Sequence, residues 1–118
     1  NPILIDEIAV NFPKLNIILT HLGTLWHNET FMVVEKNPNV YVDTSAYPYE
    51  IKRLLNKNLI ERVGDDKFIF GTDFPMPYEG KTHRMKDYTD CISGLDLPQE
   101  TKEKIFYKNF ERLLSSEK

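Results

Sequence analysis

Residues 12–23 read Phe-Pro-Lys-Leu-Asn-Ile-Ile-Leu-Thr-His-Leu-Gly, and most of what the sequence says about architecture follows from this stretch. Its centre, 16–20, is a short apolar run with β-branched side chains and polar neighbours, which is typical of a buried strand. His21 follows directly, in a loop that contains Gly23. The stretch therefore predicts a buried strand with a histidine at its C-terminal end.

Two more strands are predicted along the chain, and helical patterns separate all three. The apolar runs 40–43 and 67–70 have the length and composition of strands. Helical spacing over 3–11, ended by Phe12-Pro13, and over 51–63 predicts two helices. Further helices are expected over 29–36 and 81–93, from about 99, and in a tail at 110–114. We expect Asn28 to cap the helix over 29–36 and Gly64 to end the helix over 51–63. This alternation predicts an α/β fold with a parallel sheet that helices cover on at least one side.

The composition is that of an ordinary globular domain. The 118 residues carry a formal net charge of −3, with 41% hydrophobic and 28% charged residues. This excludes a disordered tail, and the mild acidity argues against nucleic-acid binding, which usually needs a basic face. No apolar run approaches the ~18 residues of a membrane helix, so we expect no membrane span. The one cysteine, Cys91, cannot form an internal disulfide, which favours the reducing cytoplasm.

Polar side chains stand at the C-terminal end of each predicted strand. His21 follows the first strand, Asp43 ends the second, and Asp73 follows the third. Sites in parallel α/β proteins form at these ends, which converge on one rim. Histidine together with carboxylate suits a divalent metal such as Zn²⁺, or general acid–base chemistry.

Structural roles are the alternative for the same three residues. A histidine at a strand end often serves only as a hydrogen-bonding group, and Asp73 in its Gly-Thr-Asp-Phe-Pro loop can simply form a turn. Asp43 can cap the following turn together with Ser45. Taken by themselves, the residues leave both interpretations open.

Several stretches together resemble one enzyme family. They are 12–23 with His21, 38–45 (Pro-Asn-Val-Tyr-Val-Asp-Thr-Ser), 70–75 (Phe-Gly-Thr-Asp-Phe-Pro) and 105–114 with Asn109. In this order they resemble the amidohydrolase superfamily, and more narrowly its amidohydrolase-2 branch, which contains aminocarboxymuconate-semialdehyde decarboxylase. The resemblance covers nearly the whole chain.

The resemblance implies a (β/α)₈ TIM barrel that carries a catalytic divalent metal, usually Zn²⁺, with Mn²⁺ as the alternative. It implies that His21 stands at the end of the sixth strand and Asp73 after the eighth, both catalytic and both at the metal. Trp26, Ser45 and Phe74 then become candidates for binding a small-molecule substrate.

The chain accounts for only part of such a barrel, which needs at least ~200 residues. We expect residues 1–118 to form one incomplete domain, the C-terminal part of the barrel with strands six to eight and their helices. The family's first-strand His-x-His pair and fifth-strand histidine are absent from this sequence. The missing N-terminal part of the barrel is therefore an expected partner, and the isolated chain should bind metal weakly and be inactive. Unpaired strand edges also predict a homo-oligomer.

Within an intact enzyme, the chain is expected to serve a hydrolase that attacks an ester, lactone or amide with metal-activated water. A metal-dependent decarboxylase of the same family is the alternative. A third hypothesis, from another class, is a non-catalytic α/β fragment with a structural or binding role. A doubly wound nucleotide-binding fold is disfavoured, because the sequence holds no Gly-rich phosphate loop.

Overall fold

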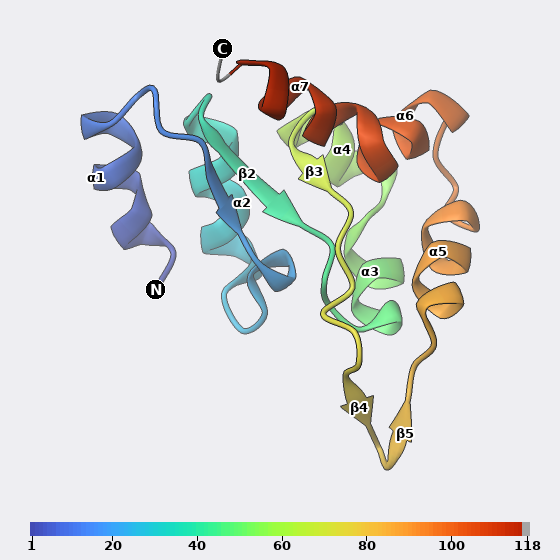
Figure 1. Cartoon of the computed structure of the whole chain (residues 1–118). Helices are drawn as coiled ribbons and strands as arrows, with labels where there is room; N and C mark the ends of the chain where they lie inside the picture. The colour runs from blue at the N-terminus through green and yellow to red at the C-terminus, as the bar shows by residue number, and fades with distance from the viewer. Residues whose placement is uncertain (117–118) are drawn as a thin grey trace.

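A parallel sheet of three strands lies at the centre of the computed structural model, which describes residues 1–116 (Figure 1). The strands are β1 (Ile17–Leu19), β2 (Val40–Asp43) and β3 (Phe68–Ile69), in the order β1-β2-β3. β2 pairs in parallel with both neighbours, so that Val42 lies opposite Leu19 and Phe68. The predicted α/β class with a parallel sheet is confirmed. Residues 117–118 of the predicted domain lie outside the described residues.

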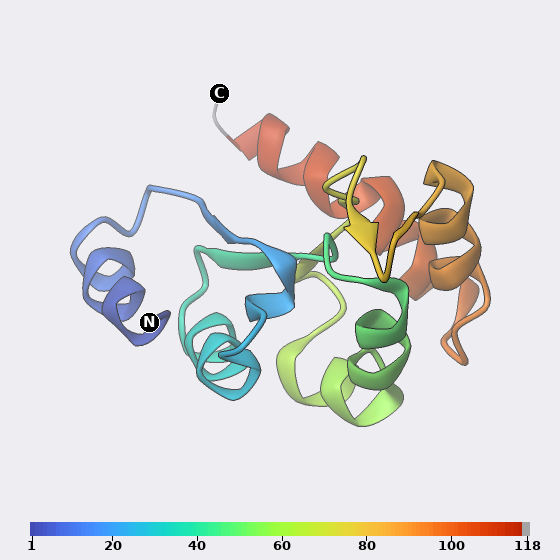
Figure 2. The ribbon, with the colours of Figure 1, turned by 90° about the horizontal axis from the view of Figure 1, so that it is seen from below.

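The first four helices lie on one side of this sheet (Figures 1 and 2). They are α1 (Ile3–Asn11), α2 (His27–Lys36), α3 (Pro48–Leu54) and α4 (Lys57–Val63). Val40 and Val42 of β2 and Phe68 of β3 are fully buried in the core that these helices share with the sheet. Because side chains alternate along a strand, Tyr41 points to the opposite face.

Among the C-terminal segments, the last helices cover that opposite face and the outer edge of β3, and the first packs against α3. These segments are α5 (Met85–Ser93), α6 (Gln99–Glu103), the π-helix η2 (Lys104–Lys108) and α7 (Asn109–Ser116). Figure 2 shows α7 on the other side of the sheet from α2, α3 and α4, and there Leu113 packs with Tyr41 and Ile69. The carbonyl of Ile105 accepts a hydrogen bond from the Phe70 amide at 2.9 Å. The helical segment thus supplies a hydrogen-bond partner where a further strand would pair.

A buried lysine closes the N-terminal end of the sheet. Lys67 is 8% exposed, and its ammonium group donates to the carbonyls of Asn37, Pro38 and Val40 at 2.9, 3.0 and 3.2 Å. Burial lowers the pKa of Lys67, since it disfavours the charged form. Hydrogen bonds to the three carbonyls compensate for the desolvation of the ammonium group. Lys67 therefore stabilises the N-terminal end of the sheet, away from the rim.

The side chain of Asn109 connects α7 to β3 and to the turn before it through hydrogen bonds. It is fully buried, and its Nδ2 donates to the carbonyls of Asp65 and Phe68 at 2.8 and 2.9 Å. Asn109→Ala should lower the free energy of unfolding by about 2 kcal/mol, because both carbonyls lose their donor. Urea unfolding followed by circular dichroism measures this, with Asn58→Ala on the exposed side of α4 as control. Equal effects of the two substitutions would contradict the assignment.

The prediction of one helix over 51–63 is wrong, because the chain breaks between α3 and α4. Asn56 has an extended backbone there, and its side-chain oxygen accepts a hydrogen bond from the Leu59 amide at 3.1 Å. Asn56 therefore caps a new helix. The apolar spacing runs through the break because Ile51, from α3, and Ile60, from α4, bury against the same core.

The predicted start of the helix at 81 and the predicted cap at Asn28 are also wrong. A hairpin of β4 (Pro77–Tyr78) and β5 (Lys81–Thr82) precedes α5. Its turn has positive φ at Glu79 and Gly80 (50° and 74°), and α5 begins only at Met85. Helix α2 begins at His27, with Trp26 at the capping position and no side-chain cap. No helix in the described part of the chain is long and apolar enough to cross a membrane.

Candidate metal site

The structure brings His21 and Asp73 together at the C-terminal ends of the strands. His21 follows β1 and Asp73 lies in the loop after β3, fifty-two positions further along the chain. The Nε2 atom of His21 is 3.9 Å from Oδ2 of Asp73, and the side chains are 41% and 52% exposed. The two groups predicted from the sequence therefore face one another at an open rim.

Both residues have left-handed backbone conformations, which are uncommon outside glycine. The φ angles of His21, Leu22 and Gly23 are 60°, 49° and 73°, and that of Asp73 is 53°. Such conformations carry strain that the surrounding structure must hold in place. Leu22 is fully buried in the core, which anchors the turn. The two residues that the sequence predicts as functional are thus among the five described non-glycine residues with a positive φ.

Hydrogen bonds from the neighbouring strand end fix the ring of His21. Its Nδ1 lies 3.0 Å from the carbonyl oxygen of Ser45 and 2.8 Å from the hydroxyl oxygen of the same residue. A carbonyl oxygen can only accept, so Nδ1 carries the proton in this arrangement. In the neutral ring, the lone pair is then on Nε2, the atom that faces Asp73.

Asp43 supports this arrangement from the end of β2. One of its carboxylate oxygens, Oδ1, accepts from the His21 amide at 2.9 Å, from the Ser45 amide at 3.0 Å and from the Ser45 hydroxyl. The expected capping partnership of Asp43 with Ser45 is present. The hydrogen bond from the His21 amide to Asp43 was not predicted from the sequence.

The chemistry of the facing atoms fits a divalent cation. Nε2 of His21 and the carboxylate of Asp73 are both acceptors, and their separation of 3.9 Å is less than twice the ~2.0–2.2 Å of a zinc–ligand bond. One ion can therefore contact both atoms. Among residues 1–116, no group of three or more His, Cys, Asp or Glu side chains could hold a metal. The described residues thus offer two ligands for such an ion.

A cavity of about 220 Å³ opens beside His21. Its lining consists of His21, Thr24, Ser45, Ala46, Tyr47, Glu50 and Met76. Of the three predicted substrate-binding candidates, only Ser45 belongs to this lining. Trp26 and Phe74 are 43% and 48% exposed and lie outside it.

A buried tyrosine lies behind the rim. Tyr88 is fully buried, and its hydroxyl has no hydrogen-bond partner among the described residues. Burial raises the pKa of Tyr88, and the nearby groups Tyr47, Asp73 and Asp87 raise it further. Its phenol therefore stays neutral near Asp73 over the physiological range.

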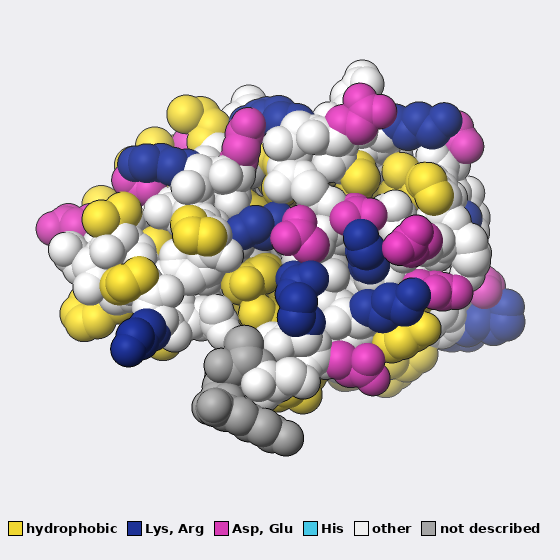
Figure 3. Space-filling model, turned by 90° about the horizontal axis from the view of Figure 1, so that it is seen from above, with side chains coloured by type: hydrophobic (Ala, Val, Ile, Leu, Met, Phe, Trp, Pro, Cys, Tyr) yellow, Lys and Arg dark blue, Asp and Glu magenta, His cyan; other side chains and the backbone are white. Residues whose placement is uncertain are grey.

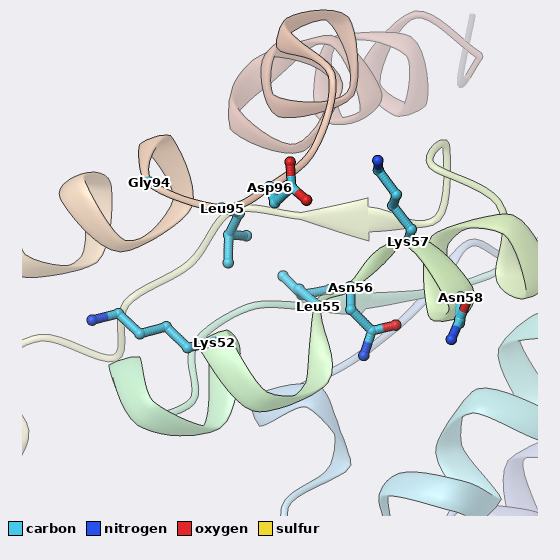
Figure 4. Close-up of a pocket in the computed structure, with 8 residues that line it drawn as sticks. All are labelled: Lys52, Leu55, Asn56, Lys57, Asn58, Gly94, Leu95 and Asp96. Atoms are coloured by element: carbon cyan, nitrogen blue, oxygen red, sulfur yellow. The ribbon is translucent and has the colours of Figure 1, made fainter.

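Another cavity, of about 450 Å³, lies away from the strand ends (Figure 4). It is formed by the junction of α3 with α4 and by the connection from α5 to α6. Figure 4 shows Lys52 and Lys57 at opposite ends of the cavity, with Leu55 and Leu95 between them. No residue predicted from the sequence lines it, and its charges do not converge on one point.

The family of this chain follows from a comparison with models of known protein families. The model of the family described as Amidohydrolase, the amidohydrolase-2 family, matches residues 1–115. The chain belongs to this family. The resemblance stated from the sequence is thereby confirmed over nearly the whole chain. A search of curated proteins found no significant match.

A solved structure shares the fold of this amidohydrolase chain. It is a dihydroxybenzoic acid decarboxylase from Polaromonas sp. JS666, solved with bound manganese and the inhibitor 2-nitroresorcinol. The TM-score is 0.60 and the sequence identity 21%, and the match covers 92% of this chain and 36% of the decarboxylase chain. The amidohydrolase chain described here therefore spans about a third of that neighbour, and the likeness concerns the fold.

Sequence reasoning on this amidohydrolase chain missed part of the cavity lining. Tyr47, Glu50 and Met76 line the cavity beside His21 and were not predicted. The position of Glu50 offered a signal, because an acidic residue in the first turn of a helix after a strand lies near the rim. Met76 offered none, since its place depends on how the loop after β3 folds back.

Proposed function

We propose that this chain is the C-terminal part of a (β/α)₈ barrel, with β1, β2 and β3 as the sixth, seventh and eighth strands. Residues 1–118 would then form one incomplete domain. Two observations support this proposal: the parallel strands alternate with helices, and the chain matches about a third of a longer enzyme chain. The partner that the proposal requires is the N-terminal part of the barrel.

Within that barrel, His21 and Asp73 take part in a catalytic centre that holds a divalent metal. The observation that carries this proposal is the 3.9 Å separation of two acceptor atoms on a rim of strand ends. The manganese in the decarboxylase structure supports a divalent ion, and Zn²⁺ is the alternative. Such an ion lowers the pKa of a coordinated water toward neutrality and polarises substrate oxygens.

The chain's own residues have distinct tasks in this proposal. Asp73, at the open rim, accepts a proton from the attacking water through its carboxylate. His21 presents Nε2, because Nδ1 is committed to Ser45. Asp43 and Ser45 hold the His21 backbone and ring, so that the lone pair keeps its direction.

The reaction proposed first is hydrolysis of an ester, lactone or amide in a small molecule, which the family name supports. The second candidate is a metal-dependent decarboxylation, and the observation that favours it is the decarboxylase with the shared fold. Both use the same two residues at the rim. A non-catalytic fragment with a structural or binding role is the third hypothesis, in which His21 and Asp73 serve only as strand-end groups.

Metal binding by the chain itself separates the two metal-dependent reactions from the non-catalytic hypothesis. We expect Mn²⁺ and Zn²⁺ to bind at one ion per chain. Asp73→Asn should weaken the affinity at least ~10-fold, the loss that substitution of even an outer partner of a metal ligand causes. Titration calorimetry measures the affinity, and metal analysis of the purified protein measures occupancy. The matched control is Asp96→Asn, because Asp96 is exposed and lies at the distant cavity. Identical binding by Asp73→Asn and the natural chain would exclude the proposed centre and favour the non-catalytic hypothesis.

Self-association and a cytoplasmic location are further parts of the proposal. The exposed apolar side chains of the N-terminal region support association: Ile3, Leu4, Ile8, Val10, Phe12, Leu15 and Ile18. Figure 3 shows hydrophobic side chains, with some charged ones between them, at the end of the molecule where α1 lies. β1 also lies at the edge of the sheet.

Light scattering tests the expected association. The natural chain should have a mass well above 13.9 kDa at micromolar concentration, whereas Ile18→Lys should shift it toward the monomer. Lysine on an edge strand blocks pairing because its charge cannot be buried against a second chain. A sharp monomer for the natural chain would contradict the expectation.

A further inference from the structure

A buried polar pair lies on the inner side of the turn that carries His21. His27 is the first residue of α2, and its Nδ1 lies 2.8 Å from the carbonyl oxygen of Leu22. Its Nε2 lies 3.4 Å from Oε1 of Glu50, which belongs to the first turn of α3. The two side chains are only 17% and 9% exposed. The pair thus joins three segments: the turn, α2 and α3.

The direction of these contacts follows from the atoms involved. The Leu22 carbonyl can only accept, so His27 donates to it through Nδ1. The carboxylate of Glu50 lies beside the other ring nitrogen, to which it forms an ion pair when the imidazole carries both protons. A buried histidine–carboxylate pair is poor evidence for stability, since apolar residues would fill the same space at lower desolvation cost. We therefore look for its role in the positions of the three segments that it connects, the turn, α2 and α3.

The turn needs such a constraint because it is strained. Two residues with side chains, His21 and Leu22, have φ angles of 60° and 49° in succession. Strain of this kind persists only where the surroundings hold the backbone from several sides. Asp43 holds the amide of His21 on one side, and His27 holds the carbonyl of Leu22 on the other.

We infer that His27 and Glu50 are positioning residues for His21, which keep its Nε2 directed at Asp73 and so set the metal affinity of the rim. Glu50 also lines the cavity beside His21, which places this pair at the wall of the space next to the proposed centre. The inference rests on the proposed metal centre, and neither His27 nor Glu50 contacts the ion in it.

The test compares two substitutions of His27. His27→Ala removes the donor to Leu22, and Mn²⁺ affinity measured by titration calorimetry should fall ~10-fold or more, as is usual for groups that orient metal ligands. His27→Asn keeps a side-chain donor near the place of Nδ1 and should restore affinity to within about threefold of the natural chain. Glu50→Gln keeps the packing and should give an intermediate loss. His83→Gln is the control, because His83 has an aspartate neighbour, Asp87, but does not touch the turn.

Hydrogen exchange of the turn gives a second readout that does not depend on metal. The amides of Gly23 and Thr24 donate to the carbonyls of Thr20 and His21 within the turn. Their exchange should accelerate at least tenfold in His27→Ala, and return toward the natural rate in His27→Asn. Natural affinity and natural exchange in His27→Ala would overturn the inference. If the natural chain bound no Mn²⁺, the proposed centre would fail, and exchange alone would decide whether His27 positions the turn.

Discussion

Gly23→Ala should lower the free energy of unfolding by about 2–5 kcal/mol, the largest loss that we expect from one methyl group in this chain. A Cβ at this position would lie 2.0 Å from Oγ1 and 2.5 Å from Cβ of Thr30. Thr30 is fully buried on α2 and cannot move away freely. The φ angle of 73° adds the strain of a left-handed residue with a side chain, about 1–2 kcal/mol.

Gly80→Ala separates the two causes. Gly80 has a φ of 74°, and a Cβ there would meet no atom within 4 Å. The control should therefore show only the backbone strain, about 1–2 kcal/mol. Urea unfolding of both variants, followed by circular dichroism, gives the difference. Equal losses would show that the contact with Thr30 relaxes at little cost and that close packing does not hold the turn.

Asp43→Ala is the second substitution with a large expected effect, on the site as well as on stability. Its carboxylate accepts hydrogen bonds from the amides of His21 and Ser45 and from the Ser45 hydroxyl. Because hydrogen bonds to charged groups contribute about 1.5–3 kcal/mol each, and water replaces part of them at a half-buried site, we expect a loss of about 3 kcal/mol. The proposed centre should bind Mn²⁺ at least ~10-fold more weakly, because the turn and the ring of His21 lose their support.

Asp43→Asn is the matched variant, since it keeps the shape and one acceptor oxygen but removes the charge. Its loss of stability should be about half that of Asp43→Ala. Unfolding by urea and Mn²⁺ titration on the same samples measure both effects. Natural Mn²⁺ affinity in Asp43→Ala, despite the loss of stability, would show that Asp43 serves the fold alone.

Much of the sheet was predictable because strand signals are local. The run 40–43 of β-branched and aromatic residues predicts β2 with its observed bounds, and 16–20 predicts β1 with one extra residue at each end. Once the strands are placed, His21 and Asp73 must lie at their C-terminal ends. Their proximity then follows from the parallel arrangement.

The errors arose where the pattern of apolar residues does not show a local change in the backbone. The apolar spacing over 51–63 is continuous, but a side-chain cap from Asn56 breaks the helix within it. The hairpin at 77–82 has no strong apolar pattern, so the polar residues before α5 resembled a helix. Neither error affects the order of the strands, so the predicted α/β class remains correct.

The amino-acid sequence by itself determined the α/β class, the three strands, the family and the two residues that face each other at the rim. These depend on patterns of a few residues and on the order in which they occur. The tertiary structure alone decided how the rim is held: the left-handed turn, the support from Asp43 and the pair of His27 with Glu50. The physical reason is that each of these contacts joins side chains on different elements, and packing fixes their distances, which no local pattern encodes.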